Sequence, residues 1–265
     1  MCLRVFSQTH IHISITIKRI LNLLWDVFVI ITTNTQTRIG ANMKTIAIIS
    51  QKGGAGKTTI STHLAVAAEL RGLHTALFDL DPQASASGWS DKRLAKTPVV
   101  VSTQAARLPI LLKQAEQQEA DLIIIDSAPN ADSASLEAAR SSDMILIPCR
   151  PAAFDLQAIS TTLSLAALAN KPAFVLLNAV PTQGRVGHEA RQALISGGVS
   201  VAEPIIHHLV AFSHSVNDGR TAQEFDPKGK AAGEINALLE WLVNMLEIKI
   251  RKRANTQTRK RTMEG

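Results

Sequence analysis

A glycine-rich segment near residue 55 carries the residue types that bind phosphate. It reads Gln51-Lys-Gly-Gly-Ala-Gly-Lys-Thr-Thr59, and its glycines let the backbone curl until several N–H groups point at phosphate oxygens. The ammonium group of Lys57 could neutralise the β- and γ-phosphates of a nucleotide, and the hydroxyl of Thr58 could ligate Mg²⁺. The segment therefore predicts a nucleotide-binding loop made of Lys52, Gly53, Gly54, Ala55, Gly56, Lys57, Thr58 and Thr59.

Carboxylates stand where two apolar runs of the chain end. Residues 122–126 are apolar up to Asp126, and an acid in that position could hold Mg²⁺ through water. Asp79 and Asp81 come at the end of another apolar run, and strand alternation predicts that both point to the same side. The alternative interpretation of this pair is two strand-end caps without a catalytic role.

The elements that must position these residues alternate between strand and helix from Met43 onward. The strand patterns cover residues 45–50, 75–79, 122–126, 144–148, 173–178 and, more weakly, 199–206. The helical patterns cover residues 57–71, 105–119, 155–169, 186–196 and 230–250. Almost wholly apolar strands separated by helices predict an α/β fold, a mostly parallel twisted sheet with helices on both faces. Ligands of such sheets bind at the carboxyl ends of the strands, where the polar segments fall.

The lysine ahead of the glycines departs from the ordinary P-loop pattern. That pattern has a glycine where this chain has Gln51, and Lys52 follows instead. In this respect the loop resembles the deviant Walker A motif of the ParA/MinD family of ATPases. The resemblance implies a P-loop fold that binds ATP and Mg²⁺. It also implies that Lys52 reaches across a homodimer to the phosphates bound by the partner, and that Lys57 binds the phosphates of its own copy. A cation supplied in trans acts as an arginine finger does, and it makes dimerisation depend on ATP.

Two further segments strengthen the resemblance to this family, and a third departs from its pattern. The run Asp79-Leu-Asp-Pro-Gln83 is similar to the family's second motif, which implies that Asp81 positions the attacking water and that Asp79 supports the Mg²⁺ shell along with Thr58 and Asp126. Asn178 stands where the family recognises adenine, although a plain turn residue remains the alternative. The loop 127–130 has one proline where the family often has two.

Positive charge is concentrated at the two ends of the chain. The net charge is +6 overall, +3 in residues 1–42, −3 in residues 43–248 and +6 in residues 249–265. The apolar run 20–31 has 12 residues, whereas a membrane-spanning helix needs about 20. We expect residues 1–42 to be an extension upstream of a functional start at Met43, residues 43–248 to be one ATPase domain, and residues 249–265 to be a basic tail.

The late segment 217–227 looks like the corresponding stretch of small ParA partition ATPases without an N-terminal helix-turn-helix domain. That resemblance implies a cytoplasmic, nucleoid-associated protein whose ATP-bound dimer binds DNA non-specifically. A ParB-type partner would stimulate weak hydrolysis and release the DNA, and this cycle would segregate plasmids or chromosomes. The basic groups that we expect to contact DNA are Arg220, Lys249, Arg251, Lys252 and Arg253.

Other functions remain open on the sequence alone. A MinD-like relative would bind a membrane through an amphipathic C-terminal helix, a related ATPase would position another cargo, and an adaptor would bind nucleotide without hydrolysing it. Aromatic residues make up 4% of the chain and tyrosine is absent, which disfavours binding of single strands by stacked aromatic side chains. Two cysteines cannot build a disulfide framework, and the histidines at 207, 208 and 214 lack the spacing of a metal site.

Overall fold

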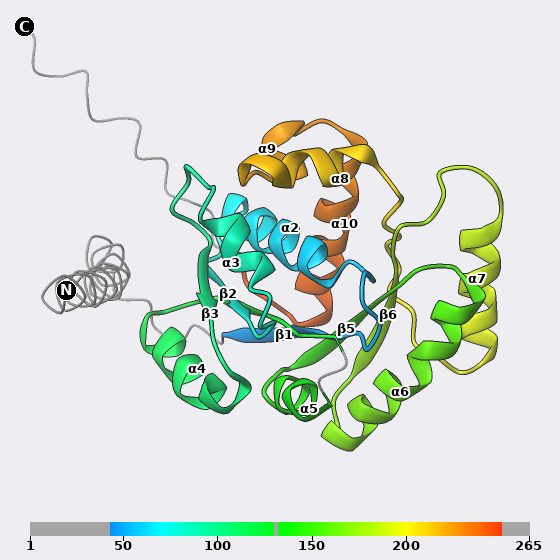
Figure 1. Cartoon of the computed structure of the whole chain (residues 1–265), viewed down its shortest axis with the longest axis horizontal. Coiled ribbons are helices and arrows are strands. Elements are labelled where there is room, and N and C mark those ends of the chain that lie inside the picture. Colours follow the sequence, from blue (N-terminus) through cyan, green and yellow to red (C-terminus); the bar gives the residue numbers. More distant parts are fainter. Residues whose placement is uncertain (1–42, 130–131, 251–265) are drawn as a thin grey trace, which may run out of the picture. The chain divides into compact units, whose positions relative to one another are not determined.

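Six short, apolar strands form the central layer of the molecule (Figure 1). The computed structural model describes residues 43–129 and 132–250. Within them the strands lie in the order β3-β2-β4-β1-β5-β6, and every neighbouring pair is parallel. The fold class predicted from the sequence is thus confirmed. The bounds are Lys44–Ile48 (β1), Thr75–Asp79 (β2), Val99–Ser102 (β3), Leu122–Asp126 (β4), Met144–Cys149 (β5) and Ala173–Leu177 (β6).

Helices cover both faces of the sheet because alternate strand residues point to opposite sides. In β1, Ile46 and Ile48 pack into one core, and Ala47 packs into the other. The first core includes residues of α2 (Lys57–Leu70), α3 (Ser85–Ser90), α8 (Val210–Ser215), α9 (Ala222–Phe225) and α10 (Lys230–Met245). The second includes residues of α4 (Leu108–Gln117), α5 (Asp132–Arg140), α6 (Ala153–Ala169) and α7 (Val186–Ser196). Figure 1 shows α2 and α10 on one side of the sheet and α4, α5 and α6 on the other.

The structure corrects the prediction at both edges of the sheet. The edge strand β3 pairs with β2, and its pattern had not been recognised because its valines are only half-buried. Residues 199–206 were predicted as a weak strand, but they form no continuous strand: there is an isolated bridge between Val175 and Val201, and Ile206 exchanges backbone hydrogen bonds with Leu177 and Val180. Pro204 has no N–H group to donate, so a continuous ladder cannot form along it.

The last helix is shorter than predicted, since α10 ends at Met245 and not at residue 250. Glu247 has a left-handed φ of 54°. The N–H of Ile248 then donates to the carbonyl of Val243 at 2.9 Å, and the N–H of Glu247 donates to Asn244 at 3.3 Å. These two bonds are a Schellman closure, and the buried side chain of Ile248 covers the helix end. Lys249 therefore lies outside the helix.

Parts of the predicted domain organisation lie outside the described residues. These are the expected extension, residues 1–42, and most of the expected basic tail, residues 251–265. The division into extension, ATPase domain and tail stays a prediction. In residues 43–129 and 132–250, no helix is both long enough and apolar enough to cross a bilayer.

A buried histidine fixes helix α2 to the helices that lie over it. His63 is fully buried, and its Nδ1 lies 2.7 Å from the carbonyl oxygen of Thr59 in the preceding turn. Its ring packs edge-on against Phe212 of α8 at 5.1 Å between centroids, and Nε2 lies 3.4 Å from the hydroxyl of Ser215. Gln223 of α9 donates to the His63 carbonyl at 3.3 Å. Burial lowers the pKa of His63 to about 4, so the ring is neutral in the folded protein at neutral pH.

The depressed pKa of His63 predicts a loss of stability in acid. Because His63 titrates near 6.5 when unfolded and near 4 when folded, its contribution is fully present above pH 6.5 and is lost as the pH falls toward 4. The loss amounts to at most about 3 kcal/mol. In urea unfolding from pH 7 to 4, the stability gap between the parent and His63→Gln should therefore shrink. The gap for His208→Gln, an exposed histidine, serves as the control, and an equal pH trend in both variants would contradict the assignment.

Candidate functional site

The phosphate-binding loop joins β1 to α2 and requires glycine at defined positions. Gly54 and Gly56 have left-handed φ values of 70° and 92°. A Cβ on Gly56 would also collide with the amide group of Asn178. Helix α2 has no side-chain cap and no acidic residue in its first turn. Its first N–H groups and its positive dipole end are therefore available to an anion such as a phosphate.

Lys57 lies inside this loop as a buried cation. Its side chain is 7% exposed, and Nζ donates to the carbonyl of Ser50 at 3.2 Å. Burial lowers the pKa of the Lys57 ammonium, and the negative charges of Asp126 and Asp81 oppose that shift. A carbonyl is a weaker partner for an ammonium group than an anion is, so a phosphate in the loop would be a better partner for Lys57.

Asp126 is a buried carboxylate without a hydrogen-bond partner among the described residues. It is the last residue of β4 and is fully buried, and neither of its carboxylate oxygens accepts a hydrogen bond from the described residues. Burial raises its pKa to about 7, while the nearby Thr58 hydroxyl opposes the shift and the charge of Asp79 adds to it. An isolated buried carboxylate is costly, whereas Mg²⁺ prefers oxygen ligands of this kind. The pair of Asp126 and Thr58 thus fits the Mg²⁺ site that the sequence predicts.

Asp79 organises the next loop. One of its oxygens accepts from the N–H of Asp81 at 3.0 Å, and the other accepts from Ala86 and Ser87 of α3 at 3.1 and 3.2 Å. Burial raises its pKa, and these three bonds counteract the shift. Asp79 also lies opposite Asp126 in the ladder between β2 and β4. The observed role of its carboxylate is to hold the backbone of the loop that leads to α3. The expected support of the Mg²⁺ shell stays a prediction.

Asp81 lies in a turn beyond the strand, so the alternation argument does not reach it. β2 ends at Asp79, and the carboxylate of Asp81 accepts from the N–H of Gln83 at 2.9 Å. Asp81 is half-buried, and its charge acts on Lys57. The turn thus carries a carboxylate near the lysine without placing it in the core.

A buried arginine, which the sequence analysis missed, holds this loop region against α9. The Arg93 side chain is 3% exposed and pairs with both oxygens of Glu224 at 3.0 and 2.9 Å. It also donates to the carbonyls of Gly219 and Thr97 at 2.7 and 2.8 Å, and it lies 4.5 Å from the ring centroid of Trp89. Two residues of the segment 217–227 therefore have a structural role: Glu224 pairs with the charge of Arg93, and the carbonyl of Gly219 accepts a hydrogen bond from it.

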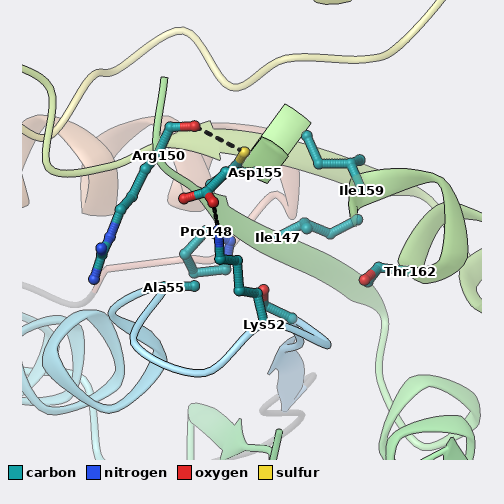
Figure 2. Close-up of a pocket in the computed structure, with 10 residues that line it drawn as sticks. Lys52, Ala55, Ile147, Pro148, Arg150, Asp155, Ile159 and Thr162 are labelled. Atoms are coloured by element: carbon teal, nitrogen blue, oxygen red, sulfur yellow. Dashed lines mark hydrogen bonds and ion pairs between the residues drawn. The ribbon is translucent and has the colours of Figure 1, made fainter. Parts of the chain in front are cut away.

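Lys52 pairs with an acid of its own chain. The half-exposed Lys52 ammonium forms an ion pair with Asp155 in the first turn of α6, whose side chain is 6% exposed. Figure 2 shows the Lys52 side chain pointing toward Asp155 across a small pocket that Ala55 and Ile159 also line. The sequence analysis placed residue 155 only at the start of a helix. Its one signal was an acid at the beginning of an otherwise apolar stretch.

Asn178 lies at the end of β6 and reaches the loop from the side. Its Nδ2 donates to the carbonyl of Ala55 at 2.7 Å, and its own N–H donates to Cys149 at 2.8 Å. The side chain is thereby fixed in orientation. The structure brings it together with Lys57, Asp126 and the glycine loop at the carboxyl edge of the sheet, as the sequence predicts.

The residues expected to contact DNA are not part of this cluster. Arg220 forms an ion pair with Asp218 at 2.7 Å, and its guanidinium lies 5.1 Å from the ring centroid of Phe225. Lys249 is exposed beyond α10. The other three, Arg251, Lys252 and Arg253, lie outside the described residues. Their role in DNA binding stays a prediction.

The unpartnered Asp126 predicts a conflict between stability and ligand binding. The pKa of Asp126 is about 7 in the folded protein and 3.8 in the unfolded chain, so the folded protein loses stability as the pH rises from about 4 to about 7. Asp126→Asn removes this charge, so it should stabilise the ligand-free protein at pH 8 by roughly 1–3 kcal/mol and by less at pH 5. Thermal unfolding with EDTA measures this gain. The same variant should lose most of the added stabilisation that Mg²⁺ and ATP give the parent, and an unchanged response to Mg²⁺ would contradict the site.

Comparisons with known proteins identify the family of the chain. Residues 46–222 match the family described as the CobQ/CobB/MinD/ParA nucleotide binding domain. The chain is 28% identical over 210 residues to "Maintenance of carboxysome distribution protein A" of Halothiobacillus neapolitanus, a match that covers 75% of this chain and 96% of that protein. It is 26% identical over 181 residues to "Protein ParA" of Rhizobium radiobacter, which covers 64% of this chain and 81% of that protein.

Among solved structures, the fold is similar to that of the septum site-determining protein MinD of Pyrococcus horikoshii, which was solved with Mg-ADP. The TM-score is 0.64 at 18% identity, with 79% of this chain and all of that one covered. The predicted cofactors, ATP and Mg²⁺, are consistent with that complex and with the loop and carboxylate described above. The chain belongs to the CobQ/CobB/MinD/ParA family of nucleotide-binding proteins, as a P-loop ATPase of the ParA/MinD type.

Proposed function

We propose that this chain is a ParA-type partition ATPase, which dimerises with ATP, binds DNA non-specifically as a dimer and is released when a partner protein stimulates hydrolysis. The observation that carries the proposal is the position of Lys52. Its ammonium group lies outside the glycine loop, half-exposed, and is held by Asp155 rather than by the loop. A lysine placed there is available to a phosphate that a second copy carries.

The residues of one copy have distinct tasks at the nucleotide. The loop N–H groups and Lys57 bind the phosphates, and Thr58 and Asp126 hold Mg²⁺. A bound Mg²⁺ neutralises charge on the phosphates and thereby favours transfer of the terminal phosphoryl group to water. Asp81 orients that water from its turn beside Lys57, because phosphoryl transfer depends more on position and charge than on a strong base.

Asn178 gives the site its preference for adenine. Its Nδ2 is already committed to the carbonyl of Ala55, so the acceptor oxygen of the same amide is left for the base. Adenine offers an amino group to such an acceptor, whereas guanine offers a carbonyl oxygen, which an acceptor repels. The support for ATP over GTP is therefore the fixed orientation of this amide.

The ion pair between Lys52 and Asp155 couples ATP binding to dimerisation. Asp155 is almost fully buried, so removal of its cation without replacement would be costly. When two copies face each other across their loops, Lys52 can approach the partner's phosphates while it remains close to Asp155. Without a triphosphate on the partner, Lys52 gains no additional anionic contact by dimerisation, and the monomer is favoured.

DNA binding by the dimer rests on exposed cations near the C-terminal end of the described residues and on the basic composition of residues 249–265. Lys228 and Lys249 are exposed, but Lys230 is paired with Glu234 and Arg220 with Asp218. Much of the positive charge lies in residues 249–265, which carry +6. A dimer doubles the number of these cations, and counterion release then makes binding steeply dependent on salt.

A second candidate function is the positioning of a protein cargo. It is favoured by the match to a carboxysome distribution protein along 96% of that protein's length. Both functions use the same ATP-driven dimer on DNA and differ in the partner that stimulates hydrolysis. A MinD-like membrane function is a third possibility, and sedimentation with anionic liposomes and ATP would separate it from DNA binding.

The proposal predicts that Lys52→Ala loses ATP-dependent dimerisation and DNA binding but keeps nucleotide binding by the monomer. The Lys52 ammonium is paired with Asp155 of α6, so the substitution should remove the contact with the second copy and leave the loop's own phosphate-binding groups in place. Light scattering with ATP and DNA binding between roughly 50 and 200 mM salt measure these effects. Lys113→Ala, an exposed lysine of α4, is the matched control. Equal DNA binding by the parent with and without nucleotide would contradict the switch.

Hydrolysis itself tests the position of Asp81. Asp81→Ala should lower the single-turnover rate of ATP hydrolysis at least about tenfold, because the attacking water loses its orienting carboxylate. Binding of ATP and formation of the dimer should remain. Asp91→Ala removes an exposed acid at the end of α3 and should leave the rate unchanged. If Asp81→Ala and the parent hydrolyse equally, the adaptor function would gain support over catalysis.

A further inference from the structure

Arg150 is a cation at the phosphate-binding loop that no part of the proposed mechanism uses. It is the first residue after β5, and β5 lies between β1, which leads into the loop, and β6, which leads to Asn178. The order of the strands therefore places Arg150 at the carboxyl edge, beside the glycine loop. The sequence analysis assigned it no role.

The guanidinium of Arg150 rests on the outer surface of the loop. Its Nη2 donates to the carbonyl of Gly54, and a Cβ on Gly54 would lie only 3.1 Å from the same nitrogen. In a phosphate-binding loop the N–H groups point inward to the phosphates, so an arginine bound to a carbonyl lies outside the cradle. Figure 2 shows the Arg150 side chain pointing away from Asp155, whereas Lys52 points toward it.

The positive charge of Arg150 is not neutralised within the described residues. Lys52 has Asp155 and Arg93 has Glu224, but no carboxylate of residues 43–129 or 132–250 forms an ion pair with Arg150. Its side chain is exposed, and its guanidinium donates to a neutral carbonyl. Hydrogen bonds from a guanidinium to a phosphate are charge-assisted and about twice as strong as bonds between neutral groups. An anion that approaches this face would therefore replace the Gly54 carbonyl.

We propose that Arg150 is a second cation that acts across the interface between two copies, with its guanidinium on the triphosphate bound to the other copy. The proposal rests on the proposed ATP-dependent dimer. Arg150 and Lys52 line the same small pocket beside the loop, so a second copy that meets Lys52 also meets Arg150. The planar guanidinium can bind two phosphate oxygens with two parallel N–H groups in a fixed geometry, which a lysine ammonium does not offer.

The test compares nucleotide binding and dimerisation in Arg150→Gln. With a non-hydrolysable ATP analogue and Mg²⁺, the dimer dissociation constant should rise about a hundredfold, because the substitution removes one charge-assisted contact, worth about tenfold, from each of the two copies. A fluorescent triphosphate, measured at protein concentrations too low for dimers, should bind within about twofold of the parent. Arg150→Lys should recover part of the dimer affinity, because it keeps the charge and loses the two-point contact.

Each outcome of this experiment has a defined meaning. Arg140→Gln, which removes another exposed arginine at the far end of α5, is the control and should dimerise like the parent. An unchanged dimer constant in Arg150→Gln would overturn the proposal. So would weaker binding of triphosphate by the monomer, because the contact would then be to the chain's own nucleotide. If the parent itself does not dimerise with the triphosphate, the proposed function fails instead, and the two failures are distinguishable.

Discussion

The burial of opposite charges at the carboxyl edge of the sheet is the constraint on which this structure depends. Lys57 and Asp126 are both removed from solvent, and neither has an ionic hydrogen-bond partner in the described residues. Buried charges of this kind are tolerated when a bound ligand of opposite charge or a metal ion pairs with them. The strands, the glycine loop and the Asp79 loop all hold these two groups in place, so the protein keeps a costly arrangement that a nucleotide and a metal ion can relieve.

The same principle of charge compensation extends outward from the site. Lys52 is compensated by Asp155 within one chain, whereas Arg150, within residues 43–129 and 132–250, donates to the neutral carbonyl of Gly54 and has no ion-pair partner. One paired and one unpaired cation, as far as the described residues show, thus lie beside the glycine loop. An interface that brings further negative charge to this side is favoured, which gives a physical reason for a nucleotide-dependent association of two copies.

Helix α2 and the Arg93 clamp connect the site to the rest of the molecule. α2 begins at the phosphate-binding loop, and its His63 is enclosed by residues of α8 and α9. The loop that carries Asp81 leads into α3, and Arg93 beyond that helix is bound to Glu224 of α9. Both connections end on the same face of the sheet. α8 and α9 are thus bound both to the helix that follows the phosphate-binding loop and to the segment that follows the Asp81 loop.

The sequence alone determined the parallel sheet, the phosphate-binding loop and the acids at the strand ends, because apolar periodicity and glycine spacing are local properties of the chain. It did not reveal Asp155, Arg93 or the contact of Arg150, since their partners lie far away in sequence and meet only when the sheet is assembled. It also extended the strand alternation past residue 79 to Asp81 and continued α10 to residue 250, because a turn and a Schellman closure depend on how neighbouring backbone groups are satisfied. Local pattern thus fixed the chemistry that is available, and tertiary packing decided which charges are paired.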